Sequence, residues 1–364
     1  MNNRNCSRQT HYLNIVITLI LYALLVSACT KTLPAQMELV LGTKCSVNLF
    51  EYGSQKLYSR IFQRIREIDR TMSAREGILF NQPSTLMLIN ENAGVAPVKV
   101  SDDLLDVLER AVHYAELSSG AFDPTIGPLV NLWGIGTENE KIPSQQEIEQ
   151  ALALINWKDL IIDREQGTAF LQRRGMELDL GAIAKGYAAD EAARIAQEEH
   201  AGRAIIDLGG NIIALGSRTA LGSRANKKQE TAPEPWRIGI QDPLDERNAY
   251  IGILRVSDKT VVTSGVYERY FEKDGKRYHH ILSTSDGYPI DNGIISVTII
   301  ADHSIDADGL STAVFTLGFR LGLELLETIP NTDAIIIFED CSVYISKGLT
   351  DIFKITGEQY TLLQ

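Results

Sequence analysis

Helical and strand-like patterns lie in separate parts of this chain instead of alternating, and this order limits the possible folds most strongly. Apolar residues recur at helical spacing in residues 58–73 and 101–120, whereas strand-like segments dominate from residue 204 to 282. A doubly wound sheet needs regular alternation of strands and helices, so the pattern predicts an α+β fold with mixed sheets and flanking helices. The 364 residues suffice for one large domain or two interlocked lobes.

Two helix starts carry specific capping signals. Ser101 precedes two acids at the beginning of the 101–120 segment, where a serine hydroxyl can accept a hydrogen bond from an unpaired backbone N–H. Ser144 and Glu147 have the spacing of a capping box, in which each side chain bonds the other residue's backbone N–H. These signals predict helices that begin just after Ser101 and Ser144.

Turn residues divide the strand-like segments. Residues 37–50 are typical of a strand with a glycine interruption, and Asp274-Gly275 between apolar residues indicates a β-hairpin turn. The polar residues 216–235, rich in glycine and proline, predict an exposed insertion. Gly209 and Gly210 lie between two apolar segments that we expect to be strands, and this Gly-Gly pair forms either a hairpin turn or a ligand contact.

The N-terminus has the layout of a secretory signal. Arg4 and Arg8 precede the apolar run LNIVITLILYALLV, which is short for a membrane span, and small residues precede Cys29. Because LVSAC resembles a bacterial lipobox, we expect residues 1–28 to be removed, Cys29 to carry lipid and residues 29–35 to form a tether. The expected location is the bacterial cell envelope, lipid-anchored to the inner membrane and facing the periplasm. A cleaved soluble protein with an incidental cysteine is the alternative.

Charge and cysteine content narrow the possible ligands. Removal of the signal takes away two arginines and moves the formal net charge from −12 to −14 over the remaining 336 residues. So acidic a chain is not expected to bind nucleic acid, and an anionic ligand must be held locally by backbone N–H groups, single cations or a metal ion. Cys45 and Cys341 lack metal-ligand spacing, which argues against structural zinc and leaves one disulfide open.

The stretch MELDLGAIAKGYAAD, residues 176–190, begins like a strand and continues like a helix. Asp179, Gly181, Lys185 and Gly186 crowd the junction. Strand-to-helix turns often use aspartate and glycine only to reverse direction, so a ligand site and an ordinary turn are both compatible with this stretch.

Two further segments have the composition of ligand loops. GAFDPTIGPLVNLWG, residues 120–134, holds Asp123, two prolines and several glycines, and we expect an irregular binding loop too broken for a helix interior. Thr263 and Ser264 stand beside Gly265 at a strand end, where hydroxyl and backbone donors can approach a phosphate. A plain tight turn fits the second segment equally well.

Asp308 and Thr312 form the sharpest candidate site. They are four residues apart at the start of an apolar helix, so their oxygens project from one face and can share a cation. Carboxylate and hydroxyl oxygens suit Mg²⁺, which typically takes its other ligands from water and substrate phosphates. The alternative is an aspartate favoured by the helix dipole beside an outward threonine.

Together these motifs resemble one family. VLGTKCSV, GAFDPTIGPLVNLWG, LDLGAIAKGYAAD, DLGGNIIALG, WRIGIQDP, TSGVYERYF, HHI and ADGLSTAVFTLG occur in the order found in the FAD:protein FMN transferases, the ApbE-like flavin-trafficking lipoproteins. The resemblance covers nearly the whole mature chain. It implies a T-fold-like α+β architecture with FAD in a cleft and Mg²⁺ at its pyrophosphate. The implied reaction cleaves FAD to AMP and attaches FMN through a phosphoester bond to a threonine of an exported redox protein.

The resemblance also assigns site residues. It implies metal ligation by Asp308, Thr312 and the main-chain oxygen of Ala182. The implied flavin contacts are Leu41, Ala121, Phe122, Asp123, Asp179, Lys185 and Ile281.

The adjacent histidines His279 and His280 must point to opposite faces of a strand. Because the family pattern places the second histidine beside Ile281, we expect His280 to point inward and accept the threonine proton, and His279 to point outward. Two solvated strand residues are the alternative. The chain departs from the family at LSTSDGYP, where Ser283 and Asp286 replace expected residues, and at Leu41, where methionine is commoner. We expect altered loop detail rather than lost folding.

Other activities stay open at this point. Attack by water instead of threonine would make the protein a Mg²⁺-dependent FAD pyrophosphatase that releases FMN and AMP. A lipoprotein that binds FAD without chemistry is a second alternative, although capture alone needs no Asp308/Thr312 pair. A surface adhesin fits least, because it needs neither this pair nor glycine loops.

Overall fold

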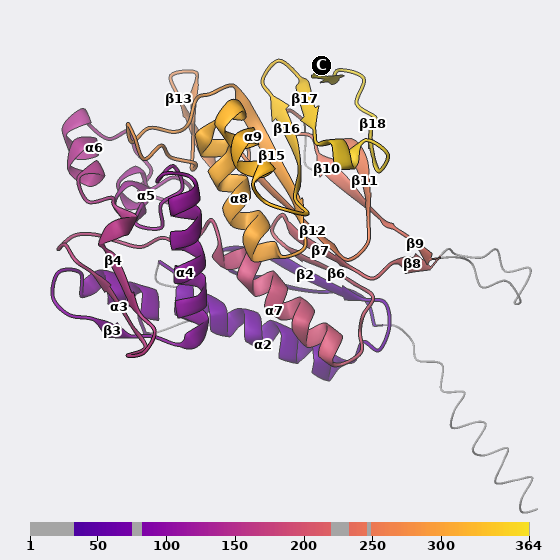
Figure 1. The fold of residues 1–364 in the computed structure, drawn as a ribbon, viewed down its shortest axis with the longest axis horizontal. Helices are drawn as coiled ribbons and strands as arrows, with labels where there is room; N and C mark the ends of the chain where they lie inside the picture. The colour runs from indigo at the N-terminus through magenta and orange to yellow at the C-terminus, as the bar shows by residue number, and fades with distance from the viewer. Residues whose placement is uncertain (1–32, 75–81, 220–232, 246–248, 364) are drawn as a thin grey trace, which may run out of the picture. The chain divides into compact units, whose positions relative to one another are not determined.

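An α+β fold is observed, as the separation of helical and strand-like patterns predicts (Figure 1). Residues 34–364 form one compact unit. Among the residues whose placement is described, no helix has the length and apolar character needed to cross a membrane. Cys29 and the expected signal lie outside the described residues. The computed structural model describes residues 33–74, 82–219, 233–245 and 249–363.

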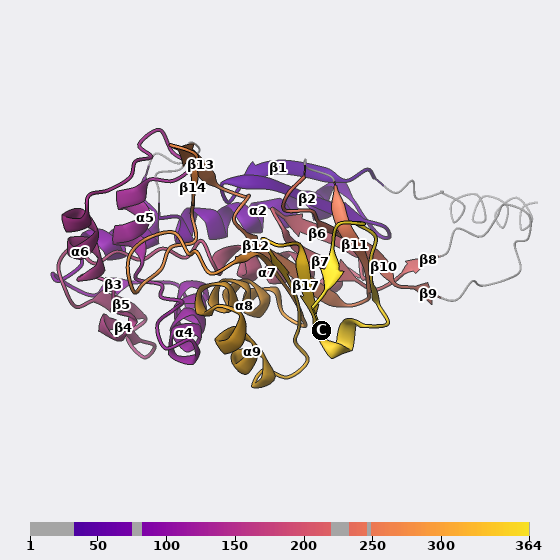
Figure 2. The same cartoon turned by 90° about the horizontal axis from the view of Figure 1, so that it is seen from above.

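A nine-stranded sheet runs through the middle of the unit (Figure 2). In spatial order its strands are β1 (Gln36–Val40), β2 (Thr43–Leu49), β6 (Ala204–Leu208), β7 (Asn211–Leu215), β12 (Lys259–Gly265), β15 (Ile294–Ala301), β16 (Asp333–Phe338), β17 (Ser342–Ile345) and β19 (Thr361–Leu362). Neighbouring strands are antiparallel except for β17 and β19, which are parallel. Such antiparallel order excludes a doubly wound parallel sheet.

Helices cover one face of this sheet and a smaller sheet covers the other. α7 (Ala184–Glu198) packs on β6 and β7, α8 (Ser304–Leu317) packs on β12 and β15, and α2 (Gln55–Met72) packs on α7 and β1. On the opposite face, an apolar cluster that includes Val261 and Leu254 joins the large sheet to a three-stranded one. The small sheet consists of β10 (Trp236–Gln241), β11 (Tyr250–Val256) and β18 (Phe353–Ile355). The helix α9 (Phe319–Glu327) packs on α8, and the short helix η2 (Lys347–Leu349) contacts β16.

A second group of helices and short strands lies beside these layers, on the left of Figure 1. Its apolar cluster includes Trp133 and Ile148, and Phe271 and Tyr278 pack against it from a separate hairpin. The elements are α3 (Thr85–Glu91), α4 (Asp102–Leu117), α5 (Gly127–Trp133), α6 (Gln145–Leu152), η1 (Trp157–Asp159), the sheet β3 (Val98–Lys99), β5 (Thr168–Leu171) and β4 (Leu160–Asp163), and the hairpin β13 (Tyr270–Lys273) and β14 (Lys276–His279). β8 (Arg218–Thr219) pairs with β9 (Pro233–Glu234) at the described ends of the expected insertion.

The local capping and turn signals are confirmed. The Ser101 hydroxyl accepts a hydrogen bond at the start of α4, and Ser144 and Glu147 form both halves of a capping box at α6. Asp274 and Gly275 both have positive φ between β13 and β14, as a two-residue hairpin turn requires. These predictions succeed because each depends on neighbours within a few residues.

Three local expectations are wrong. Residues 37–50 form two strands joined at Leu41, not one interrupted strand. The segment 120–134 contains the helix α5, because a proline fits its first turn and left-handed Gly134 ends it. Residues 176–180 form no regular strand and make only an isolated bridge between Glu177 and Ile126. Both thiols, Cys45 and Cys341, are free.

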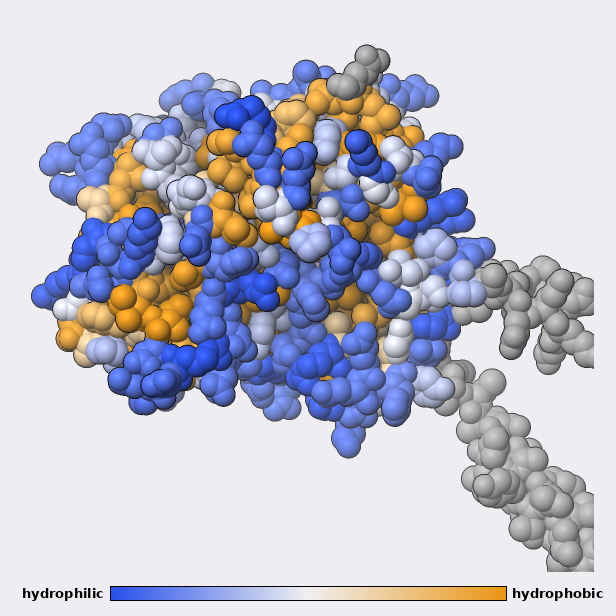
Figure 3. All heavy atoms as spheres, viewed as in Figure 1, coloured by the Kyte–Doolittle hydropathy of each residue, from blue (hydrophilic) through white to orange (hydrophobic). Residues whose placement is uncertain are grey.

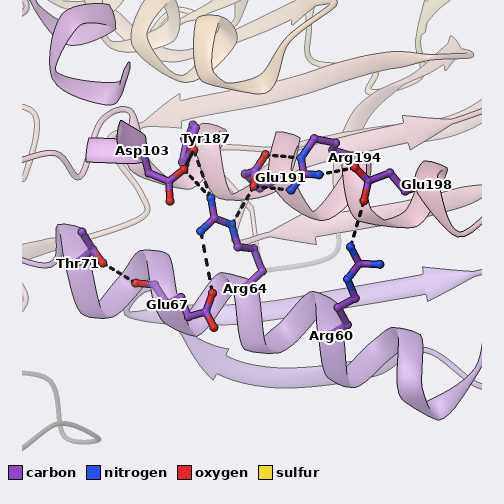
Figure 4. A network of polar contacts seen from close by, with 9 residues as sticks. All are labelled: Arg60, Arg64, Glu67, Thr71, Asp103, Tyr187, Glu191, Arg194 and Glu198. Atoms are coloured by element: carbon purple, nitrogen blue, oxygen red, sulfur yellow. Dashed lines mark hydrogen bonds and ion pairs between the residues drawn. The ribbon is translucent and has the colours of Figure 1, made fainter. Parts of the chain in front are cut away.

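A polar network ties α7 to its neighbours on the hydrophilic lower part of the face seen in Figure 3. Arg64 of α2 lies 2.7 Å from an Asp103 carboxylate oxygen of α4 and 2.8 Å from a Glu191 oxygen of α7 (Figure 4). The Tyr187 hydroxyl donates to Asp103 at 2.6 Å. Because Arg64 donates to it, the pKa of Asp103 lies below its usual range. The network fixes the first turns of α7, which contribute to the candidate site.

Candidate active site

Two chain turns and the end of a strand meet at one end of the large sheet. Gly209 packs directly on Thr43, because a Cβ on this glycine would lie 2.4 Å from the Thr43 hydroxyl oxygen. The Thr263 N–H donates to the Gly210 carbonyl at 3.4 Å. The β1–β2 turn, the β6–β7 turn and the end of β12 are therefore neighbours. Gly209 and Gly210 form a hairpin turn between β6 and β7, so the hairpin alternative for this pair is confirmed.

Leu41, an expected flavin contact, lies in the β1–β2 turn with φ of 57°. Its N–H donates to the Asp69 carboxylate of α2 at 3.2 Å. Burial raises the pKa of Asp69, and the hydrogen bond from Leu41 opposes this shift. The turn is thus attached to α2, and Asp69 is a contributor that sequence patterns did not indicate.

Asp179 joins two predicted ligand segments at the start of α7. Its carboxylate accepts the Gly181 N–H at 2.7 Å, and its own N–H donates to the Pro124 carbonyl at 2.9 Å. The Gly127 N–H donates to the Glu177 carbonyl at 3.1 Å. Segments 120–134 and 176–190 therefore lie side by side, although 176–180 lacks the expected strand.

Lys185 and Asp308 pair where α7 and α8 approach each other. The Lys185 ammonium lies 3.4 Å from Asp308 Oδ1 and donates to the Gly181 carbonyl at 2.8 Å. The Asp308 side chain is only 4% exposed, so water screens this pair less than an ion pair at the surface. A positive group thus already lies among the carbonyl and carboxylate oxygens of this site.

The other Asp308 oxygen accepts a hydrogen bond from a backbone N–H near the start of α7. Oδ2 accepts the Gly186 N–H at 2.9 Å. In a regular helix this N–H would donate to the carbonyl of Ala182, four residues earlier. Since Gly186 donates to Asp308 instead, no hydrogen bond from the described backbone reaches the Ala182 carbonyl. The expected main-chain metal ligand is therefore free to bind a cation.

Three hydroxyl groups lie near Asp308, two of them from α8 and one from β12. Ser311 Oγ donates to the Asp308 carbonyl at 2.9 Å, so Ser264 must donate its own proton to Ser311 across 2.8 Å. Thr312 then donates to Ser264 at 3.4 Å. This order leaves the lone pairs of the Thr312 oxygen available. Asp308 and Thr312 therefore present oxygens from one helix face, as their spacing predicts.

Thr263 does not join these hydroxyls. It bonds the Thr298 hydroxyl at 2.8 Å across the β12–β15 pair. Because neighbouring side chains on a strand point to opposite faces, Thr263 faces away from Ser264. Only Ser264 of the expected pair lies with Asp308 and Thr312.

The carboxylate of Asp123 is occupied within the protein. It accepts the N–H and hydroxyl of Thr125 at 2.8 and 2.7 Å and the Trp157 N–H at 3.0 Å. Burial raises the pKa of Asp123 despite these donors. Phe122 is buried edge-on against Tyr114. The side chains of Phe122 and Asp123 are thus engaged within the protein, and Asp123 holds neighbouring loops together.

His279 is buried, which contradicts the expected outward orientation. It is 6% exposed, and its Nε2 lies 2.8 Å from the Ile290 carbonyl oxygen. Its Nδ1 accepts the Ile281 N–H at 3.3 Å, so Nε2 carries the proton and the ring is neutral. Burial lowers the pKa of His279. The ring therefore packs as a structural residue, and Phe315 of α8 meets it edge-on.

His280 is half-buried and keeps one nitrogen free. Its Nδ1 lies 3.2 Å from the Arg269 carbonyl oxygen, which can only accept, so Nδ1 carries the proton and the Nε2 lone pair is available. Burial, followed by the Arg269 charge, lowers the pKa of His280 to about 3. The Lys185 charge acts in the same direction.

Comparison with known proteins places this chain in a family. The ApbE family model matches residues 41–336. The chain belongs to the ApbE family. A Treponema pallidum protein named FAD:protein FMN transferase is 36% identical over 336 residues, covering 90% of this chain and 91% of that protein. A protein of the same name from Klebsiella pneumoniae is 36% identical over 307 residues, covering 84% and 90%.

Solved ApbE structures share the fold. The ApbE protein of Thermotoga maritima matches with a TM-score of 0.76 at 31% identity, covering 87% of this chain and 98% of that one. The flavin transferase ApbE from Vibrio cholerae matches with a TM-score of 0.74 at 27% identity, covering 87% and 98%. The predicted family and its α+β architecture are confirmed.

The segment LSTSDGYP, which we expected to differ from the family pattern, is a turn with several internal hydrogen bonds. Ser283 Oγ accepts the N–H groups of Ser285 and Asp286, and the Asp286 carboxylate accepts the Tyr288 N–H at 3.1 Å. The Thr284 hydroxyl donates to the Gly120 carbonyl at 2.8 Å. Ser283 and Asp286 therefore stabilise the turn through their side chains, and Thr284 bonds it to the 120–134 segment.

Asp190 is a second acid of this region, after Asp69, that sequence patterns did not indicate. It ends the 176–190 stretch, and its carboxylate accepts the N–H groups of Ser304 and Ile305 in α8. Burial raises the pKa of Asp190 to about 6, although both backbone donors oppose the shift. No local signal reveals this partner, because it lies 114 residues away in the chain.

Proposed function

We propose that this ApbE-family chain is a Mg²⁺-dependent FAD:protein FMN transferase. One observation carries the proposal: Asp308 lies beside Lys185 and accepts the Gly186 N–H, which leaves the Ala182 carbonyl without that backbone bond, and Thr312 follows one turn later on α8. Three oxygen donors of this kind suit a hard divalent cation. The names of relatives over 84–90% of the chain support the same activity.

In the proposed reaction, a threonine oxygen of an exported acceptor protein forms a bond to the FMN phosphorus of FAD. The pyrophosphate bond to AMP breaks, AMP leaves, and the threonine proton is lost. Mg²⁺ held by Ala182, Asp308 and Thr312 would supply positive charge against the pyrophosphate oxygens. Lys185 adds a second positive charge beside Asp308, and the Asp179–Gly181 turn and Leu41 border the place where FAD is proposed to bind.

His280 is proposed to accept the threonine proton. Its low pKa keeps the ring unprotonated at neutral pH, and its tautomer leaves the Nε2 lone pair free. His279 cannot take this role, because both of its ring nitrogens are bonded to backbone groups. The pair therefore divides into one structural and one reactive histidine.

Incubation of the mature chain with FAD, Mg²⁺ and a threonine-containing acceptor peptide tests the activity. Mass spectrometry should show peptide carrying FMN and an equal amount of AMP, and chelation of Mg²⁺ should stop both. AMP without modified peptide would identify an FAD pyrophosphatase instead. Bound FAD with no AMP would identify a binding protein without chemistry.

We also propose that Cys29 carries lipid and holds the protein on the inner membrane, facing the periplasm. Its support is the sequence LVSAC after an apolar run. Cys29→Ala should abolish incorporation of labelled fatty acid and leave transfer by the purified chain unchanged. Labelling that persists in this variant would place the lipid elsewhere.

A further inference from the structure

Neither α7 nor α8 is capped by its own preceding residue. Ile183 and His303 occupy the N-cap positions, and neither side chain accepts a hydrogen bond there. The first N–H groups of a helix have no partner within the helix and need an acceptor from elsewhere when they are buried. Both helices must therefore find their caps in another part of the chain.

Each helix receives its cap from the other. Asp190 of α7 accepts the Ser304 and Ile305 N–H groups of α8 at 2.8 and 2.9 Å. In return, Asp308 of α8 accepts the Gly186 N–H of α7 at 2.9 Å. The two helices touch at Gly186 of α7 and Ser304 of α8. Each acid lies four residues, about one turn, after the contact residue of its own helix. The two caps are thus reciprocal.

The backbones of the two helices are in direct contact where the helices cross. A Cβ on Gly186 would lie 2.3 Å from the Ser304 carbonyl oxygen, so the two backbones are in contact. A movement of the first turn of α8 is therefore passed directly to Gly186 and, one turn along α8, to Asp308. Close-packed interiors transmit such shifts because they have few empty spaces to absorb them.

We propose that Asp190 is a positioning residue for the metal site. By holding the first turn of α8 against α7, it keeps Asp308 on the Gly186 N–H and so keeps the Ala182 carbonyl free for a cation. When Asp190 is removed, Asp308 withdraws and the Gly186 N–H returns to Ala182, which removes one ligand and displaces another. The inference rests on the proposed function, because the cation that Asp190 helps to bind is the proposed Mg²⁺.

Three variants of the mature chain separate this role from general stabilisation. Asp190→Ala removes the cap of α8, Asp190→Asn keeps one carbonyl oxygen as an acceptor, and Ser144→Ala removes the cap of α6, a helix that contributes no candidate site residue. Binding of Mn²⁺ alone is followed by its electron paramagnetic resonance signal. Hydrogen–deuterium exchange of residues 183–188 reports the first turn of α7 without any metal.

The Mn²⁺ dissociation constant should rise at least tenfold in Asp190→Ala, in line with the effect of groups that orient metal ligands. It should rise less in Asp190→Asn and change by less than about twofold in Ser144→Ala. Exchange in residues 183–188 should accelerate only in the Asp190 variants.

Equal Mn²⁺ affinity in the parent and Asp190→Ala overturns the proposal, whatever the exchange shows. Equal loss of affinity in Ser144→Ala also overturns it, because the effect would then be general destabilisation. Failure of the parent to bind Mn²⁺ contradicts the metal of the proposed function instead. In that case unchanged exchange in residues 183–188 would overturn the coupling between the two caps.

Discussion

The Lys185 ammonium and Asp308 Oδ1 lie 3.4 Å apart, while the second oxygen of the same carboxylate holds the Gly186 N–H. One buried acid therefore balances a cation and completes the first turn of α7. Substitution of Asp308 has both a chemical and a structural effect, and a test of the metal site has to separate them.

Asp308→Asn should provide this separation. The amide oxygen can still accept the Gly186 N–H, so this variant should lose less stability than Asp308→Ala, whereas loss of the negative charge should lower Mg²⁺-dependent transfer on the order of 100-fold. Asp308→Ala should lose transfer as well and also about 1 kcal/mol of stability through the lost cap. Transfer rates and urea unfolding of both variants are the measurements. Full Mg²⁺-dependent transfer by Asp308→Asn would remove this residue from the metal site.

The two histidines should respond to substitution in opposite ways. His280→Ala should lower single-turnover transfer to an acceptor peptide by roughly 10²- to 10⁴-fold with unchanged stability and FAD affinity, because a proton acceptor is lost. His279→Ala should lower the free energy of unfolding by about 2 kcal/mol, since the Ile290 carbonyl loses its donor and Phe315 loses a packing partner. A parental transfer rate in His280→Ala would exclude histidine from the mechanism.

Stability should depend on pH through Asp190. Its folded pKa of about 6 exceeds the ordinary value of 3.8, so between these values the folded state binds more protons than the unfolded state. The contribution of this group is therefore fully present below pH 3.8 and is lost as pH rises through about 6. Relative to Asp190→Asn, the parent should lose about 2 kcal/mol of unfolding free energy between pH 4 and pH 7. Urea titrations of both proteins across this range check it, and a constant difference would contradict it.

Arg64 should matter more for stability than Arg60, its neighbour one turn earlier on α2. Arg64→Met leaves Asp103 without its cation and leaves Glu191 with Arg194 alone, in a partly buried network, so we expect a loss of about 2 kcal/mol. Arg60→Met breaks only exposed pairs with Glu198 and Glu199 and should cost less than about 1 kcal/mol.

The pH dependence of the Arg64→Met effect gives a second check. Arg64 lowers the folded pKa of Asp103, so the stabilisation is present above the ordinary pKa and is lost as pH falls. The difference between parent and variant should therefore shrink below about pH 4. Chemical unfolding at pH 7 and pH 3 measures it, and a difference that grows at low pH would contradict the assigned ion pair.

Sequence patterns predicted those features whose causes are local. Ser144 with Glu147, and Asp274 with Gly275, act on backbone groups only a few residues away, and the structure contains both motifs. Asp308 and Thr312 share a helix face because helical spacing alone determines it. The α+β class follows from the order of periodic segments along the chain.

Features set by distant partners were not predictable in this way. The orientation of His279 depends on the Ile290 carbonyl and on Phe315 of α8, and alternation along the strand gives opposite faces without saying which one is buried. The Asp190 cap depends on Ser304, 114 residues later. The 120–134 segment was expected to be irregular from its glycines and prolines, yet a proline in a first turn and a glycine at a C-terminus are compatible with a helix.

The hydrogen bond from Gly186 to Asp308 spans 122 residues of chain, so the proposed metal site is complete only after these distant segments have met during folding. Contacts between such distant segments form late, because closing a long loop costs entropy before any contact offsets it. A nascent, truncated or partly unfolded chain that lacks α8 has no acceptor for the Gly186 N–H other than Ala182 and lacks two of the three proposed ligands. Under the proposed function, FAD would therefore be consumed only after the C-terminal third of the chain has joined the sheet.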